Sequence, residues 1–412
     1  MTTTRIDVVI VGAGHGGCSL AAALRSSGYE GSIALISDEA DYPYHRPPLS
    51  KAFMSNKGQD GGDNKLYLQN ECFWKDNRID LRLNAQAESI ETAQNVLLLN
   101  SGERLEYGHL VLATGSRART LQLPGSDLEG VEVLRTLVHA RRLRERLAGC
   151  NSVLVVGGGF IGLEVAATAH QLGKEVRVLE TASRLLERSV APVTSEYILA
   201  RHRGNGISIE LSAGVDSFIG AHGRVTAVRC GERQWPADLV IVGAGAVPNS
   251  ELAEAAGIAC ANGIIVDEQM RTLVPNIFAI GDCAAHENDY AGKVRIRLES
   301  IQNANDQARV VAQVLSGAES RYHSVPWFWS DQGDIRLQMV GLSIGRTDCV
   351  TRGDPAQGRF SVFHYRDETL IAVDSINQPM DHINSRKLLS NGISPDKALI
   401  ADPATDLKQL LG

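Results

Sequence analysis

The segment VVIVGAGHGGCSLAAALRSSG, at residues 8–28, decides the fold of this chain. The apolar run before the glycines predicts a buried parallel strand, and the alanine- and leucine-rich run after them predicts a helix. The turn between the two has the pattern G-x-G-x-x-G, with Gly12, Gly14 and Gly17. The first glycine permits a tight turn, the second lets the backbone approach a pyrophosphate, and the third lets the helix pack closely on the strand. The segment is therefore typical of a unit that binds a dinucleotide.

Acidic residues follow the next predicted strand, at residues 32–36. A carboxylate about 20 residues beyond the glycines accepts hydrogen bonds from an adenosine ribose. We predict Asp38 for this role, with Glu39 as the alternative.

The same pattern occurs again in VLVVGGGFIGLEVAATAHQLG, at residues 153–173. Here the three positions are occupied by Gly157, Gly159 and Gly162. Two such units are far more specific than one, and they predict two bound dinucleotides. The economical pair is one flavin that stays bound and one nicotinamide that binds and leaves.

The second unit also has an acid at the end of its second strand. That strand is predicted at residues 175–179 and is followed by Glu180. A carboxylate at this point binds the ribose and repels a 2′-phosphate, so NAD is favoured over NADP. Arg184 and Arg188 lie just beyond it and keep NADP as the alternative.

Length, composition and charge exclude several classes of protein. The chain has 412 residues, of which 43% are hydrophobic and 22% charged, enough for two or three globular domains. A net charge of −7 argues against a nucleic-acid or membrane partner. No apolar run reaches the roughly 18 residues that cross a bilayer, and no leader pattern precedes the first strand. We therefore expect a cytoplasmic location.

The seven cysteines are scattered, and no two have C-x-x-C spacing. Neither a disulfide framework nor a metal site is predicted. Cys18 and Cys283 are interpreted as packing residues.

Three further motifs are found in the order of a known family: LVLATGS at 110–116, LVIVGAGAVPN at 239–249 and NIFAIGDCA at 276–284. With the two glycine turns, they make the chain resemble the two-dinucleotide flavoprotein disulfide reductase superfamily over nearly its whole length. The resemblance implies that Asp282 hydrogen-bonds the ribityl chain of the flavin and that Gly245 belongs to the NAD site. It also assigns the first glycine turn to FAD and the second to NADH.

The implied fold class is α/β, with two Rossmann-like dinucleotide-binding domains and a C-terminal α+β domain. The FAD-binding domain is expected at residues 1–118 and 247–328, the NAD-binding domain at 119–246 and the C-terminal domain at 329–412. A polar, glycine-rich surface loop is predicted at residues 56–64.

Two segments narrow the family: YPYHRPPLSK at residues 42–51 and WFWSDQ at 327–332. Both resemble the ferredoxin reductases of the putidaredoxin-reductase type, which serve bacterial oxygenases. The resemblance implies that Lys51 lies beside the flavin ring. Further FAD contacts implied by it are Ala87, Arg135 and Ile301. Trp329 is a neighbour of the flavin ring or, alternatively, a core aromatic residue.

The missing cysteines support this branch. Disulfide reductases need a thiol pair beside the flavin, and their peroxidase relatives need one reactive cysteine, but residues 38–55 contain none. Electrons would then leave the flavin directly, which suits a one-electron iron–sulfur partner.

Two residues are predicted to act in the transfer of hydride from NADH to FAD. Lys51 would stabilise negative charge on the reduced ring, unless it is an ordinary surface lysine. In the resembled family a glutamate at the position of Glu164 approaches the nicotinamide and pairs with the lysine. The alternative for Glu164 is a carboxylate stabilised by the dipole of its helix.

The expected partner is a [2Fe–2S] ferredoxin of acidic character. A local basic patch would steer such a partner, and Arg295, Arg297 and Arg309 are the predicted members, with ordinary surface arginines as the alternative. The predicted function is NADH-dependent ferredoxin reduction. The alternatives are a rubredoxin or quinone-type reductase, and a flavin-binding interaction protein like the apoptosis-inducing-factor relatives.

Overall fold

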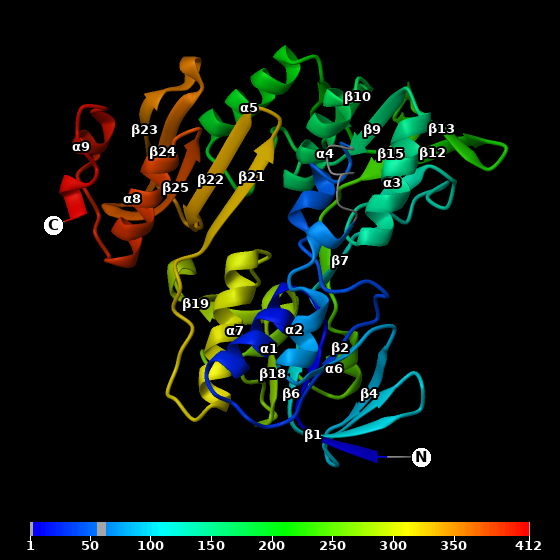
Figure 1. Cartoon of the computed structure of the whole chain (residues 1–412). Helices are drawn as coiled ribbons and strands as arrows, with labels where there is room; N and C mark the ends of the chain where they lie inside the picture. Colours follow the sequence, from blue (N-terminus) through cyan, green and yellow to red (C-terminus); the bar gives the residue numbers. More distant parts are fainter. Residues whose placement is uncertain (1–2, 56–62, 412) are drawn as a thin grey trace. The chain divides into compact units, whose positions relative to one another are not determined.

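The computed structural model describes residues 3–55 and 63–411, so most of the expected loop at 56–64 lies outside the described residues (Figure 1). The chain forms two compact units. The first comprises the described residues 3–45, 63–117 and 247–324, and the second comprises 46–55, 118–246 and 325–411. The chain passes between the units near β7 (Ser116–Ala118) and β16 (Ala246–Pro248).

A mainly parallel sheet forms the core of the first unit. Its order is β3-β2-β1-β6-β5-β4, and β18 pairs with β6. The bounds are Thr3–Val11 (β1), Ile33–Ile36 (β2), Ile79–Arg82 (β3), Ala87–Glu91 (β4), Val96–Leu99 (β5), Arg104–Leu112 (β6) and Ile277–Ala279 (β18). Because β1 pairs with strands on both sides, its run of four apolar residues at 8–11 is buried without polar alternation.

Helices and a small sheet complete the first unit. The helices are α1 (His15–Ser26), α2 (Glu71–Asp76), α6 (Glu251–Ala255) and α7 (Ile301–Leu315), and α1 packs against α7. The small sheet contains β17 (Ile264–Val266), β19 (Ala284–Asn288) and β20 (Val294–Ile296).

The second unit contains a five-stranded parallel sheet of order β11-β10-β9-β15-β8. Its strands are Val131–Val133 (β8), Ser152–Val156 (β9), Glu175–Leu179 (β10), Ser208–Glu210 (β11) and Leu239–Val242 (β15). Its helices are α3 (Leu137–Gly149), α4 (Phe160–Gln171) and α5 (Pro192–Gly204). A separate antiparallel sheet contains β12 (Ser217–Ala221), β13 (Arg224–Cys230) and β14 (Arg233–Pro236).

The C-terminal part of the second unit is an antiparallel sheet of order β21-β22-β25-β24-β23, with two helices. The bounds are Trp327–Gln332 (β21), Ile335–Gly341 (β22), Asp348–Asp354 (β23), Arg359–Arg366 (β24), Thr369–Ile376 (β25), Pro379–Ser390 (α8) and Lys397–Ala401 (α9). Side chains of β9 and α4 share one apolar core with side chains of β22 and β24. The expected C-terminal and NAD-binding domains therefore form a single compact unit.

The division of the chain differs from the expected one at the lysine segment. Residues 46–55, which include Lys51, belong to the second unit and not to the FAD-binding part. The short helix η1 (Pro47–Ser50) contacts α4, and Met54 is buried in the core of the second unit.

Candidate functional site

The first glycine turn follows β1 in the first unit. Gly12 has φ +108°, and a Cβ there would lie 2.2 Å from the carbonyl oxygen of Ala113. A Cβ at Gly17 would lie 2.0 Å from the Gly12 oxygen, whereas a Cβ at Gly14 would meet nothing within 4 Å. Gly12 and Gly17 are therefore required by packing, and the open space at Gly14 leaves the backbone accessible to a ligand. Helix α1 begins beside this space with no side-chain cap, so its terminal N–H groups favour an anion.

The acidic residues predicted to bind the ribose follow β2, and the pairing of β2 with β1 fixes where they begin. The Gly12 N–H donates to the Ile36 oxygen, so Ser37 is the first residue beyond the strand end. Asp38 is exposed, whereas Glu39 is half-buried and accepts a 2.5 Å hydrogen bond from the Tyr44 hydroxyl. Both carboxylates lie on the segment that follows the strand, and Asp38 has the more accessible one.

The segment that follows β3, the neighbour of β2, lies at the same end of the sheet as Ser37. The N–H of Ala85 donates to the Ser37 oxygen at 2.8 Å, while Ala87 lies two residues further on and pairs with Leu99 in the sheet. Ala85 is therefore bonded to the segment that follows β2, and the predicted FAD contact Ala87 lies in β4, two residues further along the chain.

Asp282 lies on the short helix η4 (Gly281–Cys283) at the end of β18. The Ser116 hydroxyl donates to its carboxylate at 3.0 Å, and the Arg297 guanidinium donates to its backbone oxygen at 3.0 Å. The N–H of Gly281 donates to Gln307 of α7, the helix that begins at Ile301 and contacts η4. Hydrogen bonds therefore hold both the side chain and the backbone of Asp282, and the residue is half-buried.

The second glycine turn repeats the first one in the second unit. Gly157 also has φ +108°, and a Cβ there would lie 2.4 Å from the Gly243 oxygen. A Cβ at Gly162 would lie 2.2 Å from the Gly157 oxygen, whereas Gly159 again has nothing within 4 Å. The sequence repeat therefore has the same backbone geometry and the same open approach.

The side chain of Glu180 binds the backbone of the second glycine turn. Its carboxylate accepts hydrogen bonds from the backbone N–H of Gly158 at 2.6 Å and of Ala182 at 2.7 Å. Arg184 donates to the backbone oxygens of Val190 and Glu187, so its guanidinium is held within its own turn. Gly245, with φ +94°, follows β15 and has open space at its Cβ position.

A charged cluster in the second unit surrounds Glu164 of α4. Its Oε2 lies 2.6 Å from Lys51 Nζ and accepts a 2.6 Å hydrogen bond from the Ser50 hydroxyl. Its Oε1 accepts a 2.7 Å hydrogen bond from the Ser330 hydroxyl of β21. The side chain of Glu164 is only 4% exposed and that of Lys51 is 23% exposed. A buried carboxylate thus holds a lysine whose ammonium group remains partly accessible.

Comparison with known proteins assigns the chain to a family. The model of the pyridine nucleotide-disulphide oxidoreductases matches residues 6–308, and the model called reductase C-terminal matches residues 327–411. The chain belongs to the pyridine nucleotide-disulphide oxidoreductases. Members of this family bind a flavin and a nicotinamide dinucleotide, and the two glycine turns provide two sites of the required kind.

Three relatives illustrate the branch of this family. A protein of Sphingomonas sp., named ferredoxin--NAD(P)(+) reductase, is 43% identical over 408 residues, 98% of this chain and 97% of its own. A rubredoxin-NAD(+) reductase of Pseudomonas putida is 41% identical over 374 residues, 90% of this chain and 96% of its own. A crystal structure of the ferredoxin reductase for the CYP199A2 system of Rhodopseudomonas palustris has a TM-score of 0.95 and 45% identity, covering 98% of this chain and all of that one.

Within this oxidoreductase fold, two of the remaining predicted contacts lie in the second unit. The backbone oxygen of Arg135 accepts a hydrogen bond from Arg46 at 2.9 Å, next to the lysine segment. Trp329 is half-buried on β21, with its ring centroid 5.6 Å from that of Trp327.

The three predicted docking arginines have different surroundings in the first unit. Arg295 and Arg309 are exposed, and each has an acidic neighbour, Glu287 at 3.5 Å and Asp306 respectively. The side chain of Arg297 is only 8% exposed and pairs with Glu299 at 2.6 Å. Its burial and its bond to the Asp282 oxygen contradict a docking role, because the guanidinium is used to hold that turn.

Sequence reasoning missed the two serines that bind Glu164. Ser50 is adjacent to the predicted Lys51, but Ser330 is 166 positions away from Glu164. The one usable signal was in α4, whose otherwise apolar middle contains Glu164 and Thr168 four residues apart. Thr168 donates to the Ser50 oxygen at 2.8 Å, so both polar residues of this face hold the lysine segment.

Several other kinds of site are not found among residues 3–55 and 63–411. This part of the chain has no group of three or more metal-binding side chains and no helix long and apolar enough to span a membrane. The thiols of Cys18 and Cys283 are buried and donate to backbone oxygens of Ala13 and Leu112. Burial raises the pKa of the Cys283 thiol, which makes it a poor nucleophile.

Proposed function

We propose that this chain is an NADH-dependent ferredoxin reductase. It would transfer electrons from NADH to a [2Fe–2S] ferredoxin that serves an oxygenase, such as a cytochrome P450 or a ring-hydroxylating dioxygenase. The observation that carries the proposal is the pair of matched glycine turns, each with open space at its middle glycine. The absence of cysteine from residues 38–55 and the names of the ferredoxin reductases described above support the same function.

The residues present fit a tightly bound FAD in the first unit. The uncapped start of α1 and the open backbone at Gly14 suit its diphosphate, Asp38 suits the ribose, and Asp282 suits the ribityl chain. Ala87 and Ile301 remain proposed contacts of FAD, and Ala85 is a further candidate because it is bonded to Ser37 after β2. When bound, FAD would supply the chemistry, because a flavin accepts a hydride and can release electrons singly.

The second unit would bind NADH at Gly157, Gly159, Gly162, Glu180 and Gly245. NADPH is disfavoured because Glu180 repels a 2′-phosphate and because Arg184 is already bound to two backbone oxygens. Lys51, held by Glu164, would place a positive charge where negative charge develops during hydride transfer.

The location proposed for this reaction is the cytoplasm. The seven cysteines are all free thiols in the structure, as is usual for a reducing compartment.

The direct test is NADH-driven electron transfer to a panel of purified acceptors from the same genome. Cytochrome c reduction serves as the readout, with reactions lacking ferredoxin as the control. Rapid reduction only when a [2Fe–2S] ferredoxin is added is the expected result.

Two other results would replace this function by another one. Faster reduction of a rubredoxin would favour the alternative that the similarity to a rubredoxin-NAD(+) reductase supports. Slow reduction by NADH, a long-lived long-wavelength absorbance band and poor turnover with every acceptor would indicate a flavin-binding interaction protein.

A further inference from the structure

A line of buried polar side chains extends from Glu164 away from Lys51. The Ser330 hydroxyl donates to Glu164 Oε1 at 2.7 Å, and the Gln332 amide nitrogen lies 3.2 Å from the Ser330 oxygen. The Gln332 amide oxygen lies 2.9 Å from His202 Nε2. All four residues belong to the second unit and are buried, and the three that support Glu164 are each no more than 1% exposed. These four side chains therefore form a continuous hydrogen-bonded line in the interior of the second unit.

Every hydrogen bond in this line has the same direction. The Gln332 amide oxygen can only accept, so His202 must donate from Nε2. The Gln332 amide nitrogen donates to Ser330, whose single proton is then donated to Glu164. Three hydrogen bonds thus run in series, and the last of them ends on the carboxylate oxygen of Glu164. Hydrogen bonds in such a series polarise one another. A chain of donors in series favours a negative charge at the oxygen where it ends, and the side chain of Glu164 is only 4% exposed.

The line depends on the register between α4 and β21. Successive side chains on one face of a strand are two residues apart, and those on one face of a helix are three or four apart. Phe328 accordingly packs on Phe160, with ring centroids 4.7 Å apart, and Ser330 meets Glu164 one turn further along α4. Gly333, at the turn after the strand, lies next to Ala167. This packing fixes the Ser330 hydroxyl opposite the carboxylate.

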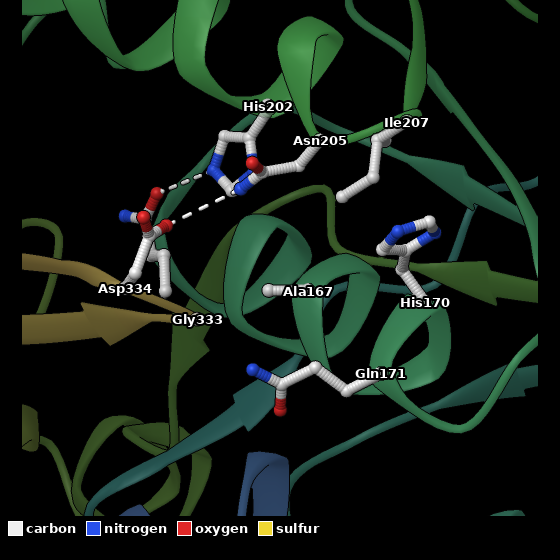
Figure 2. Close-up of a pocket in the computed structure, with 9 residues that line it drawn as sticks. Ala167, His170, Gln171, His202, Asn205, Ile207, Gly333 and Asp334 are labelled. Atoms are coloured by element: carbon white, nitrogen blue, oxygen red, sulfur yellow. Dashed lines mark hydrogen bonds between the residues drawn. The ribbon is translucent and has the colours of Figure 1, made fainter.

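The outer end of the line borders a pocket of about 270 Å³ between α4, α5 and the turn after β21. Figure 2 shows His202 beside Asn205, which donates to Asp334 at 3.2 Å, with His170 and Gln171 on the α4 side of the pocket. Burial lowers the pKa of His202, which keeps the ring neutral at neutral pH, although the hydrogen bond to Gln332 and the charge of Asp334 act in the opposite direction. The charged and titratable groups that face the line are therefore Lys51 at the inner end and His170 and Asp334 at the outer end.

We propose that Ser330, Gln332 and His202 are positioning residues for hydride transfer: they hold the Glu164 carboxylate in its orientation, and through it the Lys51 ammonium group. This inference rests on the proposed function, because it assigns Lys51 a role at the flavin. It adds to that function a support that reaches from the lysine to the pocket between α4, α5 and the turn after β21.

The test is the rate of flavin reduction by NADH in the purified holoenzyme, measured by stopped flow between pH 5 and 9. Ser330→Ala removes the donor, and we expect the limiting rate at pH 7 to fall about tenfold. We also expect the acidic limb of the pH profile to move to higher pH, because a negative charge that loses a hydrogen-bond donor is stabilised less. Ser330→Thr keeps the hydroxyl and should restore both values.

Two further variants set the scale of the effect. Lys51→Met removes the positive charge and should slow reduction at least as much as Ser330→Ala while retaining yellow FAD. Gln332→Leu interrupts the line one bond further out and should shift the pH profile in the same direction by a smaller amount. If Ser330→Ala cannot be purified, the result for Gln332→Leu alone still decides the inference.

Ser361→Ala is the matched control. Ser361 is a buried serine of β24 in the same unit, and it bonds to Ser375 and Asp381 and not to Glu164. It should leave the pH profile unchanged. Unaltered rates and profiles in Ser330→Ala or Gln332→Leu, or equal shifts in Ser361→Ala, would overturn the inference. Failure of the wild-type holoenzyme to be reduced by NADH would instead overturn the proposed function.

Discussion

At the scale of single residues, the two glycine turns separate glycines needed for folding from glycines needed for binding. Gly157 has positive φ and a backbone oxygen at 2.4 Å from its Cβ position, whereas Gly159 has φ −83° and open space. Gly159→Ala should therefore change the free energy of unfolding by less than about 0.5 kcal/mol but raise the Michaelis constant for NADH, because the methyl group occupies the approach of the diphosphate.

Gly157→Ala is the contrasting variant. Its Cβ would collide with the backbone, so it should unfold at clearly lower urea concentration than Gly159→Ala. Urea unfolding and steady-state kinetics on both variants test the distinction. An unchanged Michaelis constant in Gly159→Ala would show that the diphosphate does not approach at this residue.

At the scale of elements, a buried histidine connects β19 to α7. His286 lies 3.1 Å from the Asn288 amide and 3.4 Å from that of Gln307, the residue that accepts from Gly281 beside Asp282. Burial lowers the pKa of His286 to about 4, below its ordinary value of 6.5. As the pH falls, His286 is therefore protonated in the unfolded protein before it is protonated in the folded one. Its contribution to the free energy of unfolding is present above pH 6.5 and is lost as the pH falls toward 4.

We expect His286 to account for about 2 kcal/mol of stability lost between pH 7 and pH 5. Urea unfolding of the holoenzyme at the two pH values measures this loss. His286→Gln keeps a polar side chain without the titration, so its stability should depend less steeply on pH, even if it is lower at pH 7. Equal pH dependence in the two proteins would rule out His286 as the source. His382, whose pKa burial also lowers to about 4, is unchanged in both and provides a common background.

The elements also show what the sequence could predict. Both glycine turns and their strands were predictable because their signals are local: an apolar run, three glycines at fixed spacing and a helix. The pairing of Glu164 with Lys51 was implied by the family resemblance, but its two serine partners were not predicted, because they are 114 and 166 positions away in the sequence. Pairing over such distances depends on tertiary packing, which no local pattern encodes. For the same reason the sequence placed Lys51 with the FAD-binding domain, although Thr168 and Glu164 fix its segment to α4.

At the scale of the whole molecule, the net negative charge of the chain is unfavourable for binding an acidic partner. The net charge of −7 repels an acidic ferredoxin at long range, so attraction requires a local group of positive charges. Of the predicted arginines, Arg295 and Arg309 are exposed enough to serve, and the side chain of Arg309 is 66% exposed on α7. The ion pair of Arg309 with Asp306 lies within one turn of the helix, so the guanidinium keeps much of its surface in water.

Arg309→Glu should therefore raise the Michaelis constant for ferredoxin about fivefold at low ionic strength and weaken its dependence on salt, because steering by a surface charge is screened within about 10 Å at 0.1 M. The matched control is Arg321→Glu, a change of the same charge at a side chain 60% exposed in the same unit and paired with Glu268. NADH-to-ferricyanide turnover should be unaffected in both variants, since a small acceptor needs no docking face. If Arg309→Glu slowed ferricyanide reduction as well, the residue would act on the flavin or on NADH and not on the ferredoxin. If Arg321→Glu raised the Michaelis constant equally, the effect would come from total charge, and α7 would not form part of the docking face.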